Sequence, residues 1–141
     1  MVLASTPFHH IEYYAAHNVI VSQWYGRCTS QEYRNTLLQF LHLVDEMHTP
    51  YAIADRRLLA AISLEDARWT LQEFLEGFRR LPLKRFAFIN SFDPVAQKQL
   101  QYFMNTNKIE PFPFEVAVFE DLTSAYEWLV AATEGNHFPA A

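Results

Sequence analysis

The run Tyr51-Ala52-Ile53-Ala54 decides the fold class of this chain, because it is short, wholly apolar and placed between two longer amphipathic patterns. A strand that is apolar at every position is typical of a sheet covered on both faces. The helical pattern before it ends at Pro50, and the next opens at Ser63-Leu64-Glu65-Asp66, which has the form of a capping box. Such alternation predicts parallel strands joined by right-handed crossovers.

The alternation continues in both directions along the chain. His9 to Ala16 and Val19 to Tyr25 are rich in β-branched and aromatic residues and predict a hairpin that turns at His17-Asn18. Further strands are predicted at residues 85–89 and 116–119, and residues 105–113 are predicted to form an irregular loop. Helices are expected to begin at Thr29-Ser30, Ser63, Asp93-Pro94 and Asp121.

The predicted fold is therefore α/β, in the order β-β-α-β-α-β-α-β-α. The sheet is expected to be mostly parallel, with the N-terminal hairpin at or near one edge. No repeat and no Gly- or Ser-rich linker interrupts the chain, so a single domain is predicted over residues 1–141, with its core at about residues 8–133.

Composition excludes several functional classes. The 141 residues are 50% hydrophobic, too many for a disordered chain, and three glycines leave no Gly-rich phosphate loop. A net charge of −5 argues against a general nucleic-acid binder, and no apolar run approaches the roughly 20 residues of a membrane span. With one cysteine, Cys28, no internal disulfide can form, and a cytoplasmic location is expected.

Ligands of such sheets tend to meet the loops at the carboxyl ends of the strands. Asp55-Arg56-Arg57 follows a buried strand directly and is predicted to open a loop that runs to Ser63. One interpretation is that this segment holds an anionic or carboxylate-bearing partner; the other is that Asp55 pairs with a neighbouring arginine and ties down the loop. The candidate binding residues are Asp55, Arg56, Arg57, Ser63, Asn90 and Ser91.

Three of these candidates also have ordinary structural roles. Ser63 suits a helix N-cap, and Asn90 and Ser91 suit a turn. Metal binding is not predicted, because neither His9-His10 nor the pair His42 and His48 has the i, i+4 spacing of a helical metal site. No catalytic residue and no cofactor is assigned, since no local signature places a base beside Cys28 or Ser63.

Three apolar side chains are expected on outer helix faces. If Leu71 marks the centre of the buried stripe, a rotation of 100° per residue places Trp69 roughly opposite it, and Val95 and Tyr102 lie away from the stripe of Leu100. These three residues, Trp69, Val95 and Tyr102, are the predicted interface with a protein partner or with a second copy in a homodimer.

The order of elements resembles the SpoIIAA-like group of the STAS (anti-sigma-factor antagonist) superfamily. The residues that carry the resemblance are Trp24-Tyr25-Gly26 with Thr29, Ile53-Ala54-Asp55-Arg56, and Phe119-Glu120-Asp121 followed by Ala125 and Trp128-Leu129. It implies a non-enzymatic regulatory domain that works through protein–protein recognition. Some relatives are switched by phosphorylation of a Ser or Thr at the helix start, where this chain reads Asp55-Arg56-Arg57 and has its next hydroxyl at Ser63, so no phosphosite is carried over.

A second hypothesis is a small-molecule or lipid-binding domain. The chain has surplus Phe and Tyr, and Phe112-Pro113-Phe114 borders the predicted loop. An apolar pocket closed by that loop, with Arg56 or Arg57 fixing an acidic head group, would match the usual design of such sites.

Overall fold

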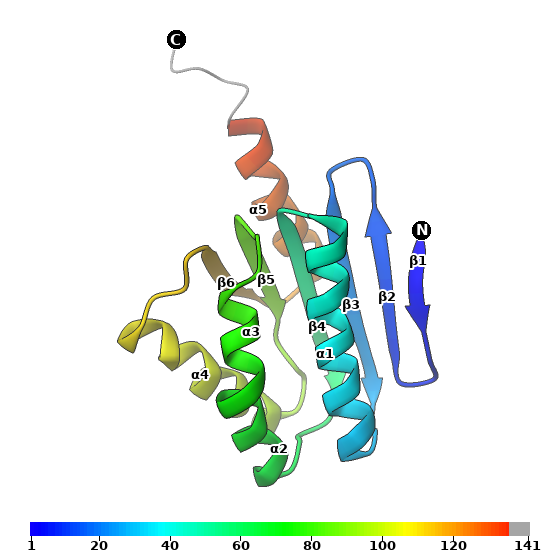
Figure 1. Ribbon diagram of the computed structural model, residues 1–141, viewed down its shortest axis with the longest axis vertical. Helices are drawn as coiled ribbons and strands as arrows, with labels where there is room; N and C mark the ends of the chain where they lie inside the picture. Colours follow the sequence, from blue (N-terminus) through cyan, green and yellow to red (C-terminus); the bar gives the residue numbers. More distant parts are fainter. Residues whose placement is uncertain (136–141) are drawn as a thin grey trace.

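The computed structural model describes residues 1–135 and contains a six-stranded sheet with helices on both faces (Figure 1). Residues 136–141 of the predicted domain lie outside the described residues. The strands lie side by side in chain order, as β1 Val2–Ser5, β2 His9–Tyr14, β3 Val19–Gly26, β4 Tyr51–Leu59, β5 Arg85–Ile89 and β6 Glu115–Phe119. The helical elements are α1 Ser30–Met47, α2 Leu64–Trp69, the π-helical turn η1 Thr70–Phe74, α3 Leu75–Arg79, α4 Pro94–Ile109 and α5 Leu122–Gly135.

The predicted topology is confirmed. Strands β2 and β3 form the antiparallel hairpin near one edge, and β3 to β6 are parallel. Asn18 at the turn has a φ of 57°, a left-handed conformation that Asn tolerates better than most residues. The short strand β1 was not predicted; it pairs antiparallel with β2 and becomes the outermost strand.

The two faces of the sheet have separate cores. Helix α5 covers one face, where Ala125 and Leu129 pack on Val19, Ile53 and Ile89. Helices α1, α3 and α4 lie over the other face (Figure 1). The centre of that second layer is Phe78, whose ring lies 4.9 to 6.2 Å from the rings of six other phenylalanines, Phe74, Phe86, Phe88, Phe103, Phe112 and Phe114.

Strand β4 is longer than predicted. It continues through Leu59, so Asp55, Arg56 and Arg57 lie within the strand and the prediction that they open a loop was wrong. After a register irregularity beyond Gln23, the parallel pairing with β3 resumes at Tyr25 and Gly26 and holds the extension in place. The strand form matters because successive side chains then point to opposite faces of the sheet.

Helix α2 continues into α3 through η1, where the Leu75 N–H donates to the Thr70 carbonyl five residues back. The extra residue rotates the part before the turn by about 100° relative to the part after it. Trp69 therefore faces α1 and packs half-buried against Tyr33, with ring centroids 6.4 Å apart, while Leu71 is 38% exposed. The prediction that Trp69 lies on the outer face was wrong.

Helix α4 is also longer than predicted, since it runs through residues 105–109 of the expected loop. The side chain of Arg79 on α3 donates to the carbonyls of Thr106 and Glu110 and thereby satisfies the end of α4. Phe112 and Phe114 follow it, are each 7% exposed and belong to the aromatic core. They do not line the cavity described below, so the prediction that their loop closes a pocket was wrong.

Candidate functional site

A cavity of about 420 Å³ lies between β3 to β5 and the helices α1, α2 with η1, and α4. Aromatic and aliphatic side chains form most of its wall, including Trp24, Phe74 and Leu100. Leu64 and Tyr102, which also line it, are exposed to solvent and mark its mouth. The volume and the lining of this cavity are typical of a small-molecule pocket, which usually has about 300 to 1,000 Å³ and a mostly apolar wall.

Arg56 is the buried charged residue among those that line this cavity. Ser22 pairs with Ala54 across β3 and β4, so Arg56, two residues on from Ala54, points to the same face as both. Arg56 is only 9% exposed, forms no hydrogen bond or ion pair with the residues the structure describes, and has its NH1 fully buried. Burial lowers the pKa of Arg56, yet an arginine remains a cation at neutral pH.

Asp55 and Arg57 lie on the opposite face of the sheet from Arg56. The Arg57 side chain donates to both carboxylate oxygens of Asp55, at 3.0 and 2.7 Å, and Gln23 donates to Asp55 at 3.4 Å. Burial opposes ionisation of Asp55, but these hydrogen bonds hold its pKa below the usual range. The pairing of Asp55 with a neighbouring arginine, one of the two interpretations of this segment, is the arrangement observed.

The other three candidate binding residues make local contacts. Ser63 is the N-cap of α2 and accepts from the Asp66 N–H at 3.1 Å. Ser91 is buried, donates to the Leu59 carbonyl at 2.8 Å and accepts from the Asp93 N–H, which ties the end of β4 to the start of α4. Asn90 keeps its side-chain oxygen buried without a partner among the described residues. None of the three lines the cavity.

His9 and Ser22 form a polar pair in the cavity wall that no local sequence pattern indicates. His9 Nε2 lies 2.7 Å from Ser22 Oγ, and the His9 ring packs edge-on against Trp24 at 4.4 Å. Burial, with a smaller contribution from repulsion by His10, lowers the pKa of His9 to about 4. His9 is therefore neutral at pH 7. The two residues are 13 apart in sequence, and only the hairpin register brings them together.

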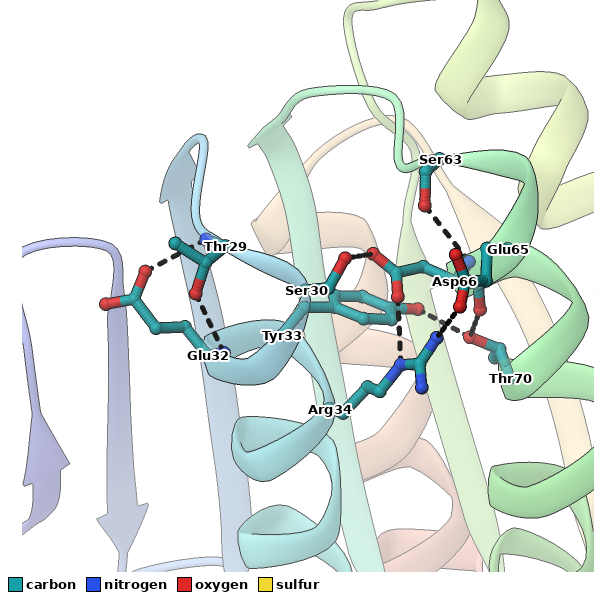
Figure 2. A network of polar contacts seen from close by, with 9 residues as sticks. All are labelled: Thr29, Ser30, Glu32, Tyr33, Arg34, Ser63, Glu65, Asp66 and Thr70. Carbon is teal, nitrogen blue, oxygen red and sulfur yellow. Dashed lines mark hydrogen bonds and ion pairs between the residues drawn. The ribbon is translucent and has the colours of Figure 1, made fainter.

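A network of hydrogen bonds joins α1 to α2 and η1 beside the cavity (Figure 2). Asp66 accepts from Ser30 Oγ at 2.7 Å and from Arg34 Nε at 2.9 Å. Burial opposes ionisation of Asp66, but these bonds hold its pKa below the usual range. The hydroxyls of Tyr33 and Thr70, both in the cavity wall, are 2.8 Å apart and also connect the two helices. These contacts fix the spacing of the helices on that side.

Val95 and Tyr102, two of the predicted interface residues, lie exposed on α4, at 56% and 69% of their surface. Seven residues separate them, which places both on one side of the helix. Trp69, the third, is half-buried against Tyr33 of α1. Among the side chains that the structure describes, in residues 1–131, no three metal-ligating groups gather at one place, and none of the described helices has the length and apolar character to cross a bilayer.

Comparisons with known proteins agree with this architecture. No protein-family model and no curated protein sequence matches the chain. Among solved structures, an uncharacterized DUF3478-family protein from Shewanella loihica PV-4 with a SpoIIAA-like fold matches over 89% of this chain and 98% of its own, with a TM-score of 0.58. The chain has the SpoIIAA-like fold. Because the two chains share only 23% sequence identity, the similarity shows that they have the same fold. It carries no conclusion about activity.

Proposed function

We propose that this SpoIIAA-like domain binds an apolar small molecule in the cavity between its sheet and helices α1, α2 and α4. The observation that carries the proposal is the cavity itself, about 420 Å³ in volume and walled mainly by apolar side chains. An apolar cavity of about 150 Å³ already holds a benzene molecule, so this one has room for a ligand almost three times larger. Burying such a ligand would remove both its surface and the cavity wall from water.

The proposed role is binding without chemical conversion. The one imidazole in the cavity wall, His9, has a pKa of about 4, which makes it a weak general base at neutral pH. Arg56, buried in the wall of the same cavity, carries a charge that suits recognition of a ligand.

The test uses the full chain and the neutral fluorescent probe N-phenyl-1-naphthylamine. We expect saturable binding at one probe per chain, with the enhanced emission typical of an apolar site. Ala54→Phe places a ring into the cavity from β4 and is expected to abolish the signal. Ala131→Phe adds the same ring on the exposed side of α5, across the sheet, and should bind the probe as the wild type does. Equal binding by the two variants would show that the probe does not enter the cavity.

Protein–protein recognition is the second candidate function, and the exposed pair Val95 and Tyr102 supports it. Apolar side chains on one side of a helix are frequent in contact surfaces. If they form one, Val95→Asp, which changes the member of the pair that does not line the cavity, will lower the mass measured by light scattering, or prevent capture of a partner, while leaving probe binding intact. An unchanged mass together with unchanged partner capture would remove this candidate.

A further inference from the structure

We infer that the ligand of the cavity is a monocarboxylate amphiphile, whose single anionic head pairs with Arg56 while its apolar chain fills the remaining space. This inference rests on the proposed function and adds the chemical class of the ligand.

The charges around the cavity have one sign. Its wall includes two arginines, Arg56 and Arg68, and no aspartate or glutamate. The chain as a whole carries a net charge of −5 and has 16 acidic residues. The absence of aspartate and glutamate from the cavity wall therefore does not follow from the composition of the chain. Arg68 lies exposed at the surface, where water screens it, and Arg56 is enclosed. The enclosed part of the cavity therefore holds a positive charge that no side chain of the described residues balances.

The guanidinium of Arg56 is free to recognise an acid. A guanidinium has five N–H donors in a planar fork that matches the two oxygens of a carboxylate, and Nη1 of Arg56 is buried with no hydrogen-bond partner among the described residues. An unpaired buried cation is costly to keep, whereas the same cation paired with a carboxylate is neutralised and hydrogen-bonded. The neighbouring Arg57 makes the kind of ion pair that Arg56 lacks, because its side chain donates two hydrogen bonds to the carboxylate of Asp55.

The number of charges favours a monoanion. His9 is neutral at pH 7, and the Tyr33 hydroxyl, whose pKa is raised mainly by burial, is neutral as well. One enclosed positive charge then balances one negative charge. A phosphate monoester, which carries nearly two at pH 7, would leave an excess negative charge in an apolar cavity.

The volume sets the size of the chain. Scaling from the cavity that holds one benzene gives room for about 17 non-hydrogen atoms. A saturated carboxylate of about twelve carbons fits within this limit, so dodecanoate is a suitable probe. The aromatic wall formed by Phe74, Phe78 and Phe103 would contact its methylene groups.

The experiment compares dodecanoate, dodecanol and dodecyl phosphate, each below its critical micelle concentration, by isothermal titration calorimetry on the full chain at pH 7.5. We expect the wild type to bind dodecanoate at least tenfold more tightly than dodecanol and more tightly than dodecyl phosphate. Arg56→Met should weaken dodecanoate binding by roughly tenfold to a hundredfold, in line with the loss of charge-assisted hydrogen bonds, and leave dodecanol binding within about twofold.

Two further variants keep the result interpretable. Arg57→Met removes a cation one residue away on the opposite face and should leave all three affinities unchanged. Arg56→Lys keeps the charge but not the fork, and should give an affinity for dodecanoate between those of the wild type and Arg56→Met. Circular dichroism of each variant confirms folding before titration.

The other outcomes separate the two proposals. If dodecanol binds the wild type as tightly as dodecanoate, the carboxylate inference fails and the apolar binding function stands. If dodecyl phosphate binds most tightly, the inference of a monocarboxylate is wrong. If Arg57→Met weakens dodecanoate as much as Arg56→Met does, the head group is not held by Arg56. If the wild type binds none of the three and also no neutral probe, both proposals fail.

Discussion

On the α5 face of the sheet the core residues Val19, Ile53, Ala87, Ile89, Ala125 and Leu129 are completely shielded from solvent, whereas the opposite face encloses a cavity of about 420 Å³. Two adjacent arginines of β4 lie one on each of these faces, and their surroundings differ accordingly. Arg57, on the α5 face, is paired with Asp55, while Arg56, on the cavity face, is enclosed and unpaired within the described residues. The α5 face is therefore fully packed, whereas the cavity face keeps a buried charged group without a partner, as expected where a ligand completes the packing.

The largest expected effect tests how well the aromatic core that borders the cavity is packed. Phe78→Ala removes the ring at the centre of the aromatic core and should lower the free energy of unfolding by about 3–5 kcal/mol, measured by urea titration. Leu129→Ala on the α5 face is the matched control, with an expected cost of about 2–5 kcal/mol. A loss below about 1 kcal/mol for Phe78→Ala would mean that this whole face is loosely packed.

The next effect concerns pH and the His9 side chain. Its pKa is about 4 in the folded chain against 6.5 as the ordinary value, so between these values the unfolded chain binds more protons. The stabilisation is therefore present above pH 6.5 and is lost as the pH falls toward 4, by about 3 kcal/mol in total. Comparing urea titrations of the wild type and His9→Gln from pH 7 to 4 isolates this contribution. Parallel stability curves for the two proteins would contradict it.

The two arginines are expected to have opposite effects on stability. Arg56→Met removes an unpaired buried cation and should raise the free energy of unfolding of the ligand-free chain by about 1–3 kcal/mol. Arg57→Met leaves the buried carboxylate of Asp55 without its partner and should lower it by about 1–2 kcal/mol. Thermal unfolding of the two variants side by side decides this, and a drop in Tm for both would abolish the distinction between the two faces.

The smallest effect lies at the start of α2, beside the cavity. Ser63→Ala removes the N-cap hydroxyl and should lower the free energy of unfolding by about 1 kcal/mol. Ser63→Asp keeps a capping oxygen and should retain the stability of the wild type. If both variants lose the same amount in urea titrations, the contribution of Ser63 is not capping.

Much of the fold was predictable because apolar periodicity reports burial directly. The hairpin of β2 and β3, the parallel order and the capping residues Thr29 and Ser63 followed from local patterns. The end of β4 was not predictable in the same way, since Asp-Arg-Arg breaks an apolar run and is held in the strand by pairing with β3 and by the ion pair across the α5 face. The additional turn of α4 depends on Arg79, a residue from a distant element.

The candidate site was predicted in part. The sequence singled out both Arg56 and Arg57, and strand alternation would have shown which of them faces the cavity had β4 been known to continue past Ala54. The cavity itself could not be predicted, because an empty volume arises from how separate elements fit together. Trp69 was misplaced because nothing in the local pattern shows that the helix accommodates an additional residue at η1.

That π-helical turn has a consequence for how the length of this chain can vary. Thr70, Leu71 and Phe74 of η1 all line the cavity, so one residue more or fewer in this segment changes which side chains form the wall. Deleting a residue such as Gln72 would restore a regular α-helix and turn a different set of side chains inward. Single-residue insertions and deletions at this point thus offer a route by which the wall of the cavity can change without a change of fold.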